Sequence, residues 1–298
     1  NNQFNTLAMN QDLQNPGSSN DLINLQGAEY IYCDGYAWDC DGVDVTIVLT
    51  EYQRSRAIAM SATPGGDGTG MTLSLLENAM RDIALNFQNT THNVAVNETA
   101  DTIRPNALTA SLNYSDGTLT VTTSETIDLT PVSLVKPQLI SLLNDNTVAT
   151  TSNRVQDIRA AEVLTNTDGL TFSLRLTEYE RIRALEISGT PGGDGSAVLL
   201  ETSLGAFFDI GQNPCNPNMG IVVTEYLDSV RPSLTQAWLD LNNGTLRVFF
   251  DETIDSTPTS LVTPESFLLV NNGGDVSTHT SDLALSSSEV LPAGKYMF

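Results

Sequence analysis

The sequence is short of histidine, cysteine and basic side chains, and these shortages exclude several classes of protein. Its 298 residues include two histidines, three cysteines and 13 basic residues against 36 acidic ones, for a formal net charge of −23. The two histidines, His92 and His279, stand in unrelated contexts and predict neither a zinc site nor a Ser-His-Asp site. A field this negative repels phosphate backbones, so we expect no nucleic acid partner.

Long apolar runs and catalytic motifs are missing as well. No apolar run approaches the roughly 18–20 residues needed to cross a bilayer, so we expect no membrane span. The chain has no Gly-x-Ser-x-Gly motif and no P-loop. One carboxylate pair, Glu125 and Asp128, has the residue types of a glycosidase site, but it recurs as Glu252 and Asp255, which favours a structural role. We therefore predict that the protein is not an enzyme.

The cysteines predict one disulfide and leave one thiol over. Cys33 and Cys40 are close enough in sequence to close a small loop as a disulfide, the alternative being two reduced cysteines that happen to be close. Cys215 lies in Asn213-Pro-Cys-Asn-Pro, a turn-rich stretch that we expect to be exposed. This third cysteine is then either free or paired between subunits.

An internal repeat organises the chain. Residues 49–68 return as residues 176–195 with 14 of 20 positions identical at an offset of 127, and both copies contain Leu-Thr-Glu-Tyr and Thr-Pro-Gly-Gly-Asp-Gly. The same offset matches Asp101…Arg104-Pro105 to Asp228…Arg231-Pro232, and Glu125-Thr-Ile-Asp128 to Glu252-Thr-Ile-Asp255. Self-similarity at a fixed period predicts a tandem array with a unit of about 127 residues.

Each unit has the pattern of β-structure. Apolar and polar residues alternate along four segments, which places one face of each on a core: 45–49, 119–121, 172–176 and 246–250. Asp116-Gly117 and Asn243-Gly244 predict hairpin turns. Thr50…Gln53 and Thr177…Glu180 resemble capping boxes, so a short helical turn should follow two of the strands, and Thr-Pro-Gly-Gly-Asp-Gly should then reverse the chain. Short strands with almost no long helix predict an all-β fold of tandem β-sandwiches.

In this order the motifs resemble immunoglobulin-like (Ig-like) or cadherin-like repeats. The resemblance is carried across most of residues 42–262 by Arg-Pro before an alternating strand, Asx-Gly-Thr-Leu, Glu-Thr-Ile-Asp, Leu-Thr-Glu-Tyr-x-Arg and Thr-Pro-Gly-Gly-Asp-Gly. Such repeats occur in long extracellular proteins of algae and protists, including mastigoneme-like (flagellar hair) proteins, and the unit is also similar to bacterial surface-layer Ig-like domains. The resemblance implies an Ig-like sandwich with an extracellular or cell-surface, structural and glycosylated role.

The phase of the repeat predicts one complete unit and two partial ones. Residues 101–227 form a complete Ig-like unit; residues 1–100 hold the later strands with an N-terminal arm and the Cys33–Cys40 loop; residues 228–298 hold the opening strands with a C-terminal arm. A half sandwich exposes an apolar face and unpaired edges. We therefore expect the C-terminal half of one copy to complete the N-terminal half of the next, the alternative being a fragment of a longer array. Such a head-to-tail contact generates a filament.

Two kinds of ligand site follow from this interpretation. Four sequons, at Asn89, Asn97, Asn113 and Asn243, are predicted to carry N-linked glycans. Acidic residues near the unit boundaries and in the Gly-Gly-Asp-Gly loops are candidate calcium ligands, since carboxylate clusters suit calcium: Asp67, Glu98, Asp101, Asp194, Glu225 and Asp228. The alternative is that Asp67 and Asp194 close their own turns or pair with nearby arginines, namely Arg54, Arg56, Arg181 and Arg183.

The sequence thus predicts a structural subunit of an extracellular, glycosylated filament whose partners are copies of itself. The alternative is a repeat-based adhesin or carbohydrate-binding protein, for which the array is only a stalk.

Overall fold

The computed structural model describes residues 7–10, 22–30, 43–144, 154–155, 158–270 and 283–284, and these are mostly strand with few helices. The predicted β-rich fold is therefore confirmed. The chain divides into two compact units, Asn1–Asp228 and Ser229–Phe298. The boundary predicted near residue 100 lies inside the first unit, so we name two parts of that unit by their residues: the N-terminal segment (7–100) and the central segment (101–228).

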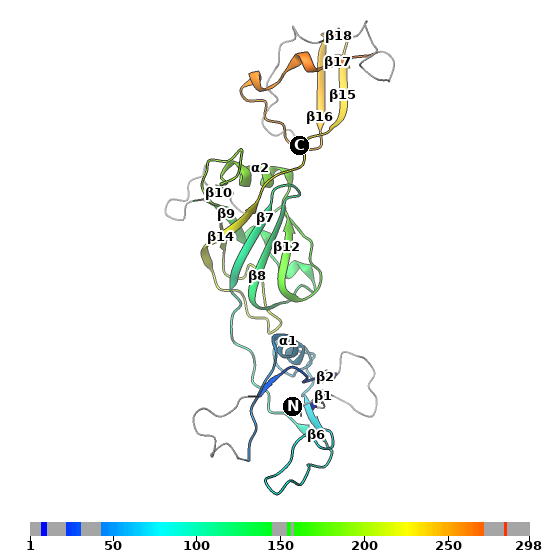
Figure 1. Ribbon diagram of the computed structural model, residues 1–298, viewed down its shortest axis with the longest axis vertical. Coiled ribbons are helices and arrows are strands. Elements are labelled where there is room, and N and C mark those ends of the chain that lie inside the picture. Colours follow the sequence, from blue (N-terminus) through cyan, green and yellow to red (C-terminus); the bar gives the residue numbers. More distant parts are fainter. Residues whose placement is uncertain are drawn as a thin grey trace. The chain divides into compact units, whose positions relative to one another are not determined.

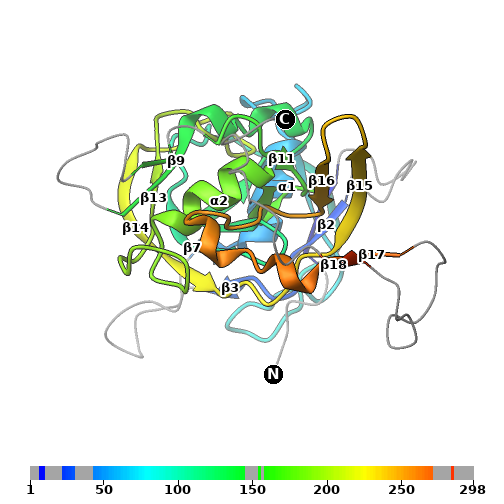
Figure 2. The ribbon, with the colours of Figure 1, turned by 90° about the horizontal axis from the view of Figure 1, so that it is seen from above.

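The central segment forms a curled, mixed sheet in the order β10-β9-β13-β14-β7-β8-β12-β11 (Figure 1). Its strands are β7 (Ala107–Asn113), β8 (Thr118–Ile127), β9 (Ile140–Leu143), β10 (Arg154–Val155), β11 (Glu162–Val163), β12 (Gly169–Arg175), β13 (Leu199–Thr202) and β14 (Asn218–Tyr226). Every pair is antiparallel except β14 with β7, which is parallel. Two 3-10 turns, Val132–Leu134 and Pro137–Leu139, precede β9. Figure 2 looks down on helix α2 (Glu178–Glu186) and shows β9, β13 and β14 along one side of it.

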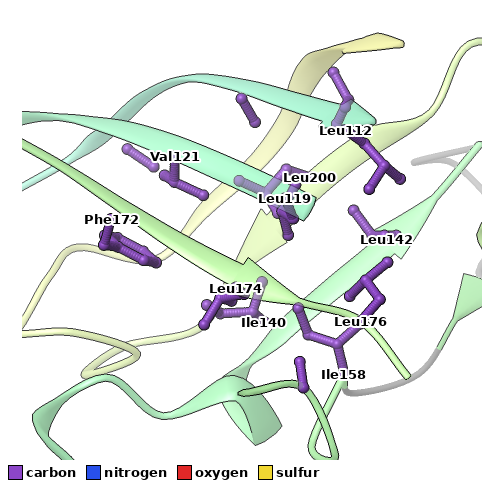
Figure 3. Close-up of a cluster of buried hydrophobic side chains, with 14 of the residues drawn as sticks. Leu112, Leu119, Val121, Ile140, Leu142, Ile158, Phe172, Leu174, Leu176 and Leu200 are labelled. Atoms are coloured by element: carbon purple, nitrogen blue, oxygen red, sulfur yellow. The ribbon is translucent and has the colours of Figure 1, made fainter. Parts of the chain in front are cut away.

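The core of the central segment is closed and apolar. Alternate residues of β8 are buried, as the pattern of Leu119 and Val121 predicted, and they meet Phe172 and Leu174 of β12 (Figure 3). Leu112, Leu119, Phe172 and Leu174 are all fully inaccessible to solvent. Each such side chain contributes roughly 1.5–3 kcal/mol by leaving water, so this core holds the segment together.

Local sequence explains the turns and the two helices. Gly117 has φ +69° and Gly244 has φ +72°, at the tips of two hairpins, where most other residues would be strained. Thr50 and Thr177 are the N-caps of α1 (Glu51–Ala59) and α2, and each makes the reciprocal bonds of a capping box. The predicted helical turns are confirmed. Helix α2 begins and ends 127 residues after α1 begins and ends.

The N-terminal segment has two separate small sheets. One has the order β2-β1-β5-β6 and the other pairs β3 with β4. Their strands are β1 (Leu7–Asn10), β2 (Leu22–Asn24), β3 (Glu29–Tyr30), β4 (Ile47–Val48), β5 (Thr72–Leu75) and β6 (Thr91–Ala95). Five buried residues make its core, Ile23, Leu25, Ala57, Met60 and Met71, while several strand residues around them are only half-buried.

The second unit is a pair of two-stranded sheets. Hairpin β15 (Leu234–Asp240) with β16 (Thr245–Phe250) is followed by 3-10 turns Thr259–Leu261 and Pro264–Ser266, and then β17 (Leu268–Leu269) pairs with β18 (Leu283–Ala284). Every residue of β15 is exposed, including Trp238 and Leu239. The hairpin thus carries large apolar side chains without the cover of a core.

The exposure predicted for Cys215 is wrong. Its side chain is fully buried, with Sγ 3.4 Å from the Ser203 carbonyl oxygen, and it joins the central core as a free thiol. The turn-rich segment folds back because the Cys215 N–H donates to the Phe207 carbonyl and Pro214 bridges to Phe208. A thiol buried in this way is not presented for a disulfide between subunits. Cys33 and Cys40 lie outside the described residues.

Among the residues that the structure describes, neither helix has the length and apolar character required to pass through a bilayer.

Candidate functional site

The main polar cluster of the first unit is built around Arg54, on helix α1. The capping box at Thr50 fixes the start of this helix and places Glu51 in its first turn. Arg54 lies three residues on, so its Nε and Nη2 atoms donate to the two Glu51 carboxylate oxygens at 2.8 and 3.1 Å. Hydrogen bonds within α1 therefore already fix the orientation of the Arg54 guanidinium.

Arg54 joins the N-terminal segment to the central segment. Its Nη1 donates to Asp101 at 2.8 Å and its Nη2 donates to Glu125, on β8, at 2.7 Å. Glu51 strengthens the same junction, because its Oε1 accepts the Thr126 backbone N–H at 2.7 Å. One arginine thus binds three carboxylates that belong to two parts of the chain.

A third buried carboxylate completes the cluster. Asp209 is 1% exposed, and its oxygens accept the backbone N–H and side-chain amide of Asn213 at 2.7 and 3.0 Å. One carboxylate oxygen from each of Asp101, Glu125 and Asp209 lies within 4.8 Å of the other two. Three acidic groups this close repel one another, and Arg54 is the cation that offsets the repulsion.

The pKa values follow from this packing. Burial raises the pKa of Glu125, and the charges of Asp209 and Asp101 raise it further, against the opposing effect of Arg54. Burial likewise raises the pKa of Asp209. Burial would also raise the pKa of Glu51, but hydrogen bonds from Arg54 and Thr126 outweigh it and lower that pKa. The pKa of Arg54 is raised although burial opposes this, since Glu51, Glu125 and Asp101 all stabilise its charge.

This arrangement suits a guanidinium better than a calcium ion. Calcium takes six to eight oxygen ligands at about 2.3–2.6 Å, which requires carboxylates that are not already committed. Here the Arg54 guanidinium lies within 2.8 Å of oxygens of both Asp101 and Glu125, and both Asp209 oxygens accept from Asn213. The chemistry that the cluster performs is therefore structural: it fixes the orientation of α1 against β8.

Arg181, which lies 127 positions after Arg54, has a similar cluster. Its Nε donates to Glu178 at 2.8 Å, and its Nη1 donates to Asp228 at 2.7 Å and to the Tyr114 carbonyl at 2.8 Å. Only 7% of the Arg181 side chain is exposed, against 32% of the Arg54 side chain. The two arginines therefore bind their equivalent aspartates in the same way, and the tip of the β7–β8 hairpin covers the second one.

The six candidate calcium ligands do not come together. Glu98 accepts the backbone N–H groups of Ala62 and Met71 at 2.8 and 2.7 Å, and Glu225 accepts the Tyr114 hydroxyl at 2.9 Å. Asp67 and Asp194 each accept the N–H two residues on, so they close their own turns as the alternative proposed. Asp101 and Asp228 bind the two arginines. Within the described ranges, only Asp101 of the six belongs to a group of carboxylates close enough to share an ion.

The sequons occupy accessible positions with one exception. Asn89, Asn97 and Asn243 are exposed, and Asn113 is half-buried at the end of β7. Asn113 and Asn243 each accept the N–H two residues on, across the hairpin tips. Glycan attachment at Asn243 would leave this turn intact. The Thr245 N–H donates to the side-chain amide oxygen of Asn243, whereas a glycan is attached to the amide nitrogen.

Sequence reasoning named Arg54, Asp101 and Glu125 but not their partnership, and it did not name Asp209 as a site residue. It considered Arg54 and Asp101 separately, and it treated Glu125 as part of a strand turn. The available signal was that Arg54, Asp101 and Glu125 all recur at the same offset, as Arg181, Asp228 and Glu252. Asp209 carries a weaker signal, because its equivalent, Asp82, instead bonds Asn86 in an exposed turn.

Comparison of the chain with protein-family models, with curated proteins and with solved structures gave no match.

Proposed function

We propose that the protein is a structural subunit of an extracellular filament, built from Ig-like β-sandwich units and assembled from copies of itself. The observation that carries this proposal is a contrast between positions that lie 127 residues apart. Leu112 and Tyr114 are fully buried in the central segment, whereas their equivalents Leu239 and Leu241 are 42% and 84% exposed. Apolar side chains that occupy the positions of core residues but stay exposed favour a partner that buries them.

The N-terminal segment shows the same contrast on its own side. Phe172 is fully buried, whereas the equivalent Val45 is 46% exposed. The chain therefore carries two different incomplete apolar faces, one in each unit. A contact between two different faces is heterologous, so it repeats from copy to copy and produces a filament unless it closes into a ring.

The Arg54 cluster supports a mechanical role. It joins the N-terminal and central segments through one guanidinium and three carboxylates, of which Asp101 and Glu125 are largely buried. A guanidinium with one bidentate carboxylate and two further carboxylate partners holds a fixed geometry better than isolated surface ion pairs do. An array joined in this way would resist bending at the junction.

The extracellular and glycosylated parts of the proposal rest on the sequence resemblance and on the exposed sequons. Asn89, Asn97 and Asn243 are accessible to a glycosyltransferase. The net charge of −23 then serves as a solvated coat, and apolar faces hold copies together despite their mutual repulsion. Calcium remains a proposal as a counterion that reduces this repulsion, rather than as a ligand of the Arg54 cluster.

One feature favours the alternative, a carbohydrate-binding module. A hollow of about 280 Å³ on the β15–β16 hairpin is lined by an aromatic ring and polar groups, the residue types that hold a sugar: Trp238, Asp240, Asn243, Thr245 and Arg247. Its openness to solvent and the sequon at its rim weigh against it. We therefore keep it as the second candidate.

Electron microscopy with sedimentation velocity tests the proposed function. We expect the purified chain to form fibres with a regular axial repeat above a threshold concentration, and we expect 0.3 M NaCl or millimolar calcium to lower that threshold by screening the negative charge. A chain that stays monomeric up to about 1 mM under all of these conditions would rule out the filament. Monomers that bind a glycan array would favour the second candidate instead.

A further inference from the structure

We propose that hairpin β15–β16 of one copy inserts into the N-terminal segment of another copy, between its strands β6 and β4. This inference rests on the proposed function and specifies how the copies join. It predicts a completed sheet in the order β2-β1-β5-β6-β15-β16-β4-β3, in which the two central strands come from the partner copy.

The order of the strands is the first argument. In the central segment, β13 lies between β9 and β14, and β12 lies between β8 and β11. In the N-terminal segment, β5 lies between β1 and β6 in the same way, and β4 pairs with β3. Leu75 and Val48 lie 127 positions before Thr202 and Arg175, whereas their partners Leu7 and Glu29 both lie 133 positions before Ile140 and Glu162. The two pairings therefore share one register after the same shift of six residues. Among its described residues, the N-terminal segment thus has both flanks of the eight-stranded sheet but not its central hairpin.

The unpaired stretches are the second argument. In the central segment, residues 223–226 pair with β7 and residues 171–175 pair with β8. The positions 127 earlier are 96–99 and 44–48. Residues 96–99 and 44–46 have no strand pairing, whereas the neighbouring residues 91–95 and 47–48 do. The N-terminal segment therefore loses regular structure at the two edges that face the missing hairpin.

The hairpin itself is the third argument, because β15–β16 matches β7–β8 pair for pair. Leu239 opposes Leu246 as Leu112 opposes Leu119, and Trp238 opposes Arg247 as Ser111 opposes Thr120. Both hairpins have a register shift at the same place, between residues 234 and 236 and between residues 107 and 109. A hairpin with the same register and bulge presents the same alternation of faces to a sheet.

The pairs that would form stay apolar. In the central segment, Phe172 opposes Val121. The equivalent pair is Val45 of the acceptor, which is 46% exposed, and Val248 of the donor. Insertion would bring these two valines together and bury Val45 as Phe172 is buried.

The polar groups at the hairpin tip are complementary too. In the central segment, Glu225 uses one oxygen for the Tyr114 hydroxyl, 2.9 Å away, and the other for two backbone N–H groups. In the N-terminal segment, Glu98 uses one oxygen for each of its two backbone N–H groups, Ala62 and Met71. The donor hairpin correspondingly has Leu241 in place of a tyrosine, so no hydroxyl is brought to a carboxylate that already has its partners.

Strands β17 and β18 fall outside the inserted part. Leu269 opposes Leu283 as Leu142 opposes Val155, so β17–β18 corresponds to β9–β10. The N-terminal segment already has β1 and β2 in those two places. The hairpin is therefore the part of the second unit for which the acceptor has a vacancy.

The register yields a cross-linking test. Ser173 on β12 opposes Thr120 on β8, and their hydroxyl oxygens are 2.9 Å apart on the outer face. The equivalent pair is Thr46 of the acceptor and Arg247 of the donor, and both are exposed in the separate units. Directly opposed residues of an antiparallel pair have Cβ atoms about 4.5–5.5 Å apart, close to the roughly 3.5–4.5 Å of a disulfide, so cysteines at these positions can be joined.

The experiment mixes a Thr46→Cys chain with an Arg247→Cys chain of different tag under mild oxidation. We expect a disulfide to join the two differently tagged chains in most molecules. Mass spectrometry of the joined peptides locates it at positions 46 and 247. The matched control replaces Arg247→Cys with Thr235→Cys, an exposed position on the same hairpin, and should cross-link at least tenfold less. The background from the native cysteines comes from mixing Thr46→Cys with the unaltered chain.

The outcomes separate this inference from the proposed function. Fibres without the 46–247 disulfide, or with equal cross-linking in the control, would overturn the hairpin insertion and leave the filament standing. A chain that neither forms fibres nor cross-links would overturn both. In a third arm, a double Thr46→Cys/Arg247→Cys chain that closes the disulfide only within monomers would show that the hairpin enters its own chain, which contradicts exchange between copies.

Discussion

Replacing Leu239 with aspartate should raise the threshold concentration for assembly at least 100-fold while leaving the thermal unfolding of the first unit unchanged. Leu239 is 42% exposed in the separate unit and equivalent to the fully buried Leu112. Insertion of the hairpin would bury it, which contributes about 1.5–3 kcal/mol for leucine, whereas a buried unpaired carboxylate costs several kcal/mol. Sedimentation velocity over a concentration series gives the threshold directly.

The matched control is the neighbouring Trp238→Ser. Trp238 is 59% exposed, more than Leu239, but its equivalent on β7 is Ser111, which lies on the outer face of the sheet. If copies joined through non-specific hydrophobic contacts, loss of the tryptophan would raise the assembly threshold more than loss of the leucine. We instead expect less than a fivefold effect for Trp238→Ser, and an effect larger than that of Leu239→Asp would contradict insertion of the hairpin.

Replacing Arg54 with methionine should destabilise the first unit by about 2–3 kcal/mol at pH 7. Removing one partner of a buried ion pair typically costs about 3–5 kcal/mol, and the value here is smaller because 32% of the Arg54 side chain is exposed. The cost arises because Glu125 and Asp209 stay buried beside Asp101 without a cation. Urea unfolding followed by circular dichroism measures the difference. Arg56→Met, two residues along the same helix, should cost less than Arg54→Met, since Arg56 stacks on the exposed ring of Tyr52.

The deficit of the Arg54→Met variant should shrink as the pH falls from 7 towards 4. The pKa values of Glu125 and Asp209 are raised in the folded state, so folding favours their protonated forms. Their contribution to stability is therefore greatest below the ordinary carboxyl pKa and declines as the pH rises through the raised value. The contribution of Glu51 to stability has the opposite pH dependence, because its pKa is lowered in the folded state and its stabilisation is lost on acidification. Much of that lowering comes from Arg54, so the variant lacks it, and its loss in the wild type also narrows the deficit at low pH. A deficit that is independent of pH, or that grows on acidification, would show that the cluster is not what Arg54 stabilises.

Features fixed by short stretches of sequence were predictable. The capping boxes gave the two helices, because Thr50 and Gln53 satisfy each other's backbone groups whatever the surroundings. The hairpin tips at Gly117 and Gly244 followed from the backbone conformation that glycine permits. The alternation along β8 identified its buried face. Each of these depends on residues within about one turn or one strand.

Features fixed by distant contacts were not predictable. Arg54 binds Glu125 across 71 positions, and no local pattern distinguishes that glutamate from the exposed ones. Cys215 was expected at the surface because asparagine and proline surround it, yet the hydrogen bond from its N–H to the Phe207 carbonyl turns the segment inward. The vacancy for a hairpin in the N-terminal segment is likewise a property of sheet order, which emerges only when β1–β6 are placed beside one another. Whether each unit is an Ig-like sandwich stays a prediction from the sequence resemblance.

The most direct test of the account is backbone hydrogen exchange, read by mass spectrometry, on the same chain below and above its assembly threshold. We expect amides in residues 44–46 and 97–99, and the amides of hairpin 234–250 that do not bond across β15–β16, to exchange quickly in the monomer and to become protected at least tenfold on assembly, because these are the edges that pair. The central strands β7 and β8 should be protected in both states. Fibres in which those three stretches still exchange at the monomer rate would contradict completion of one copy by another.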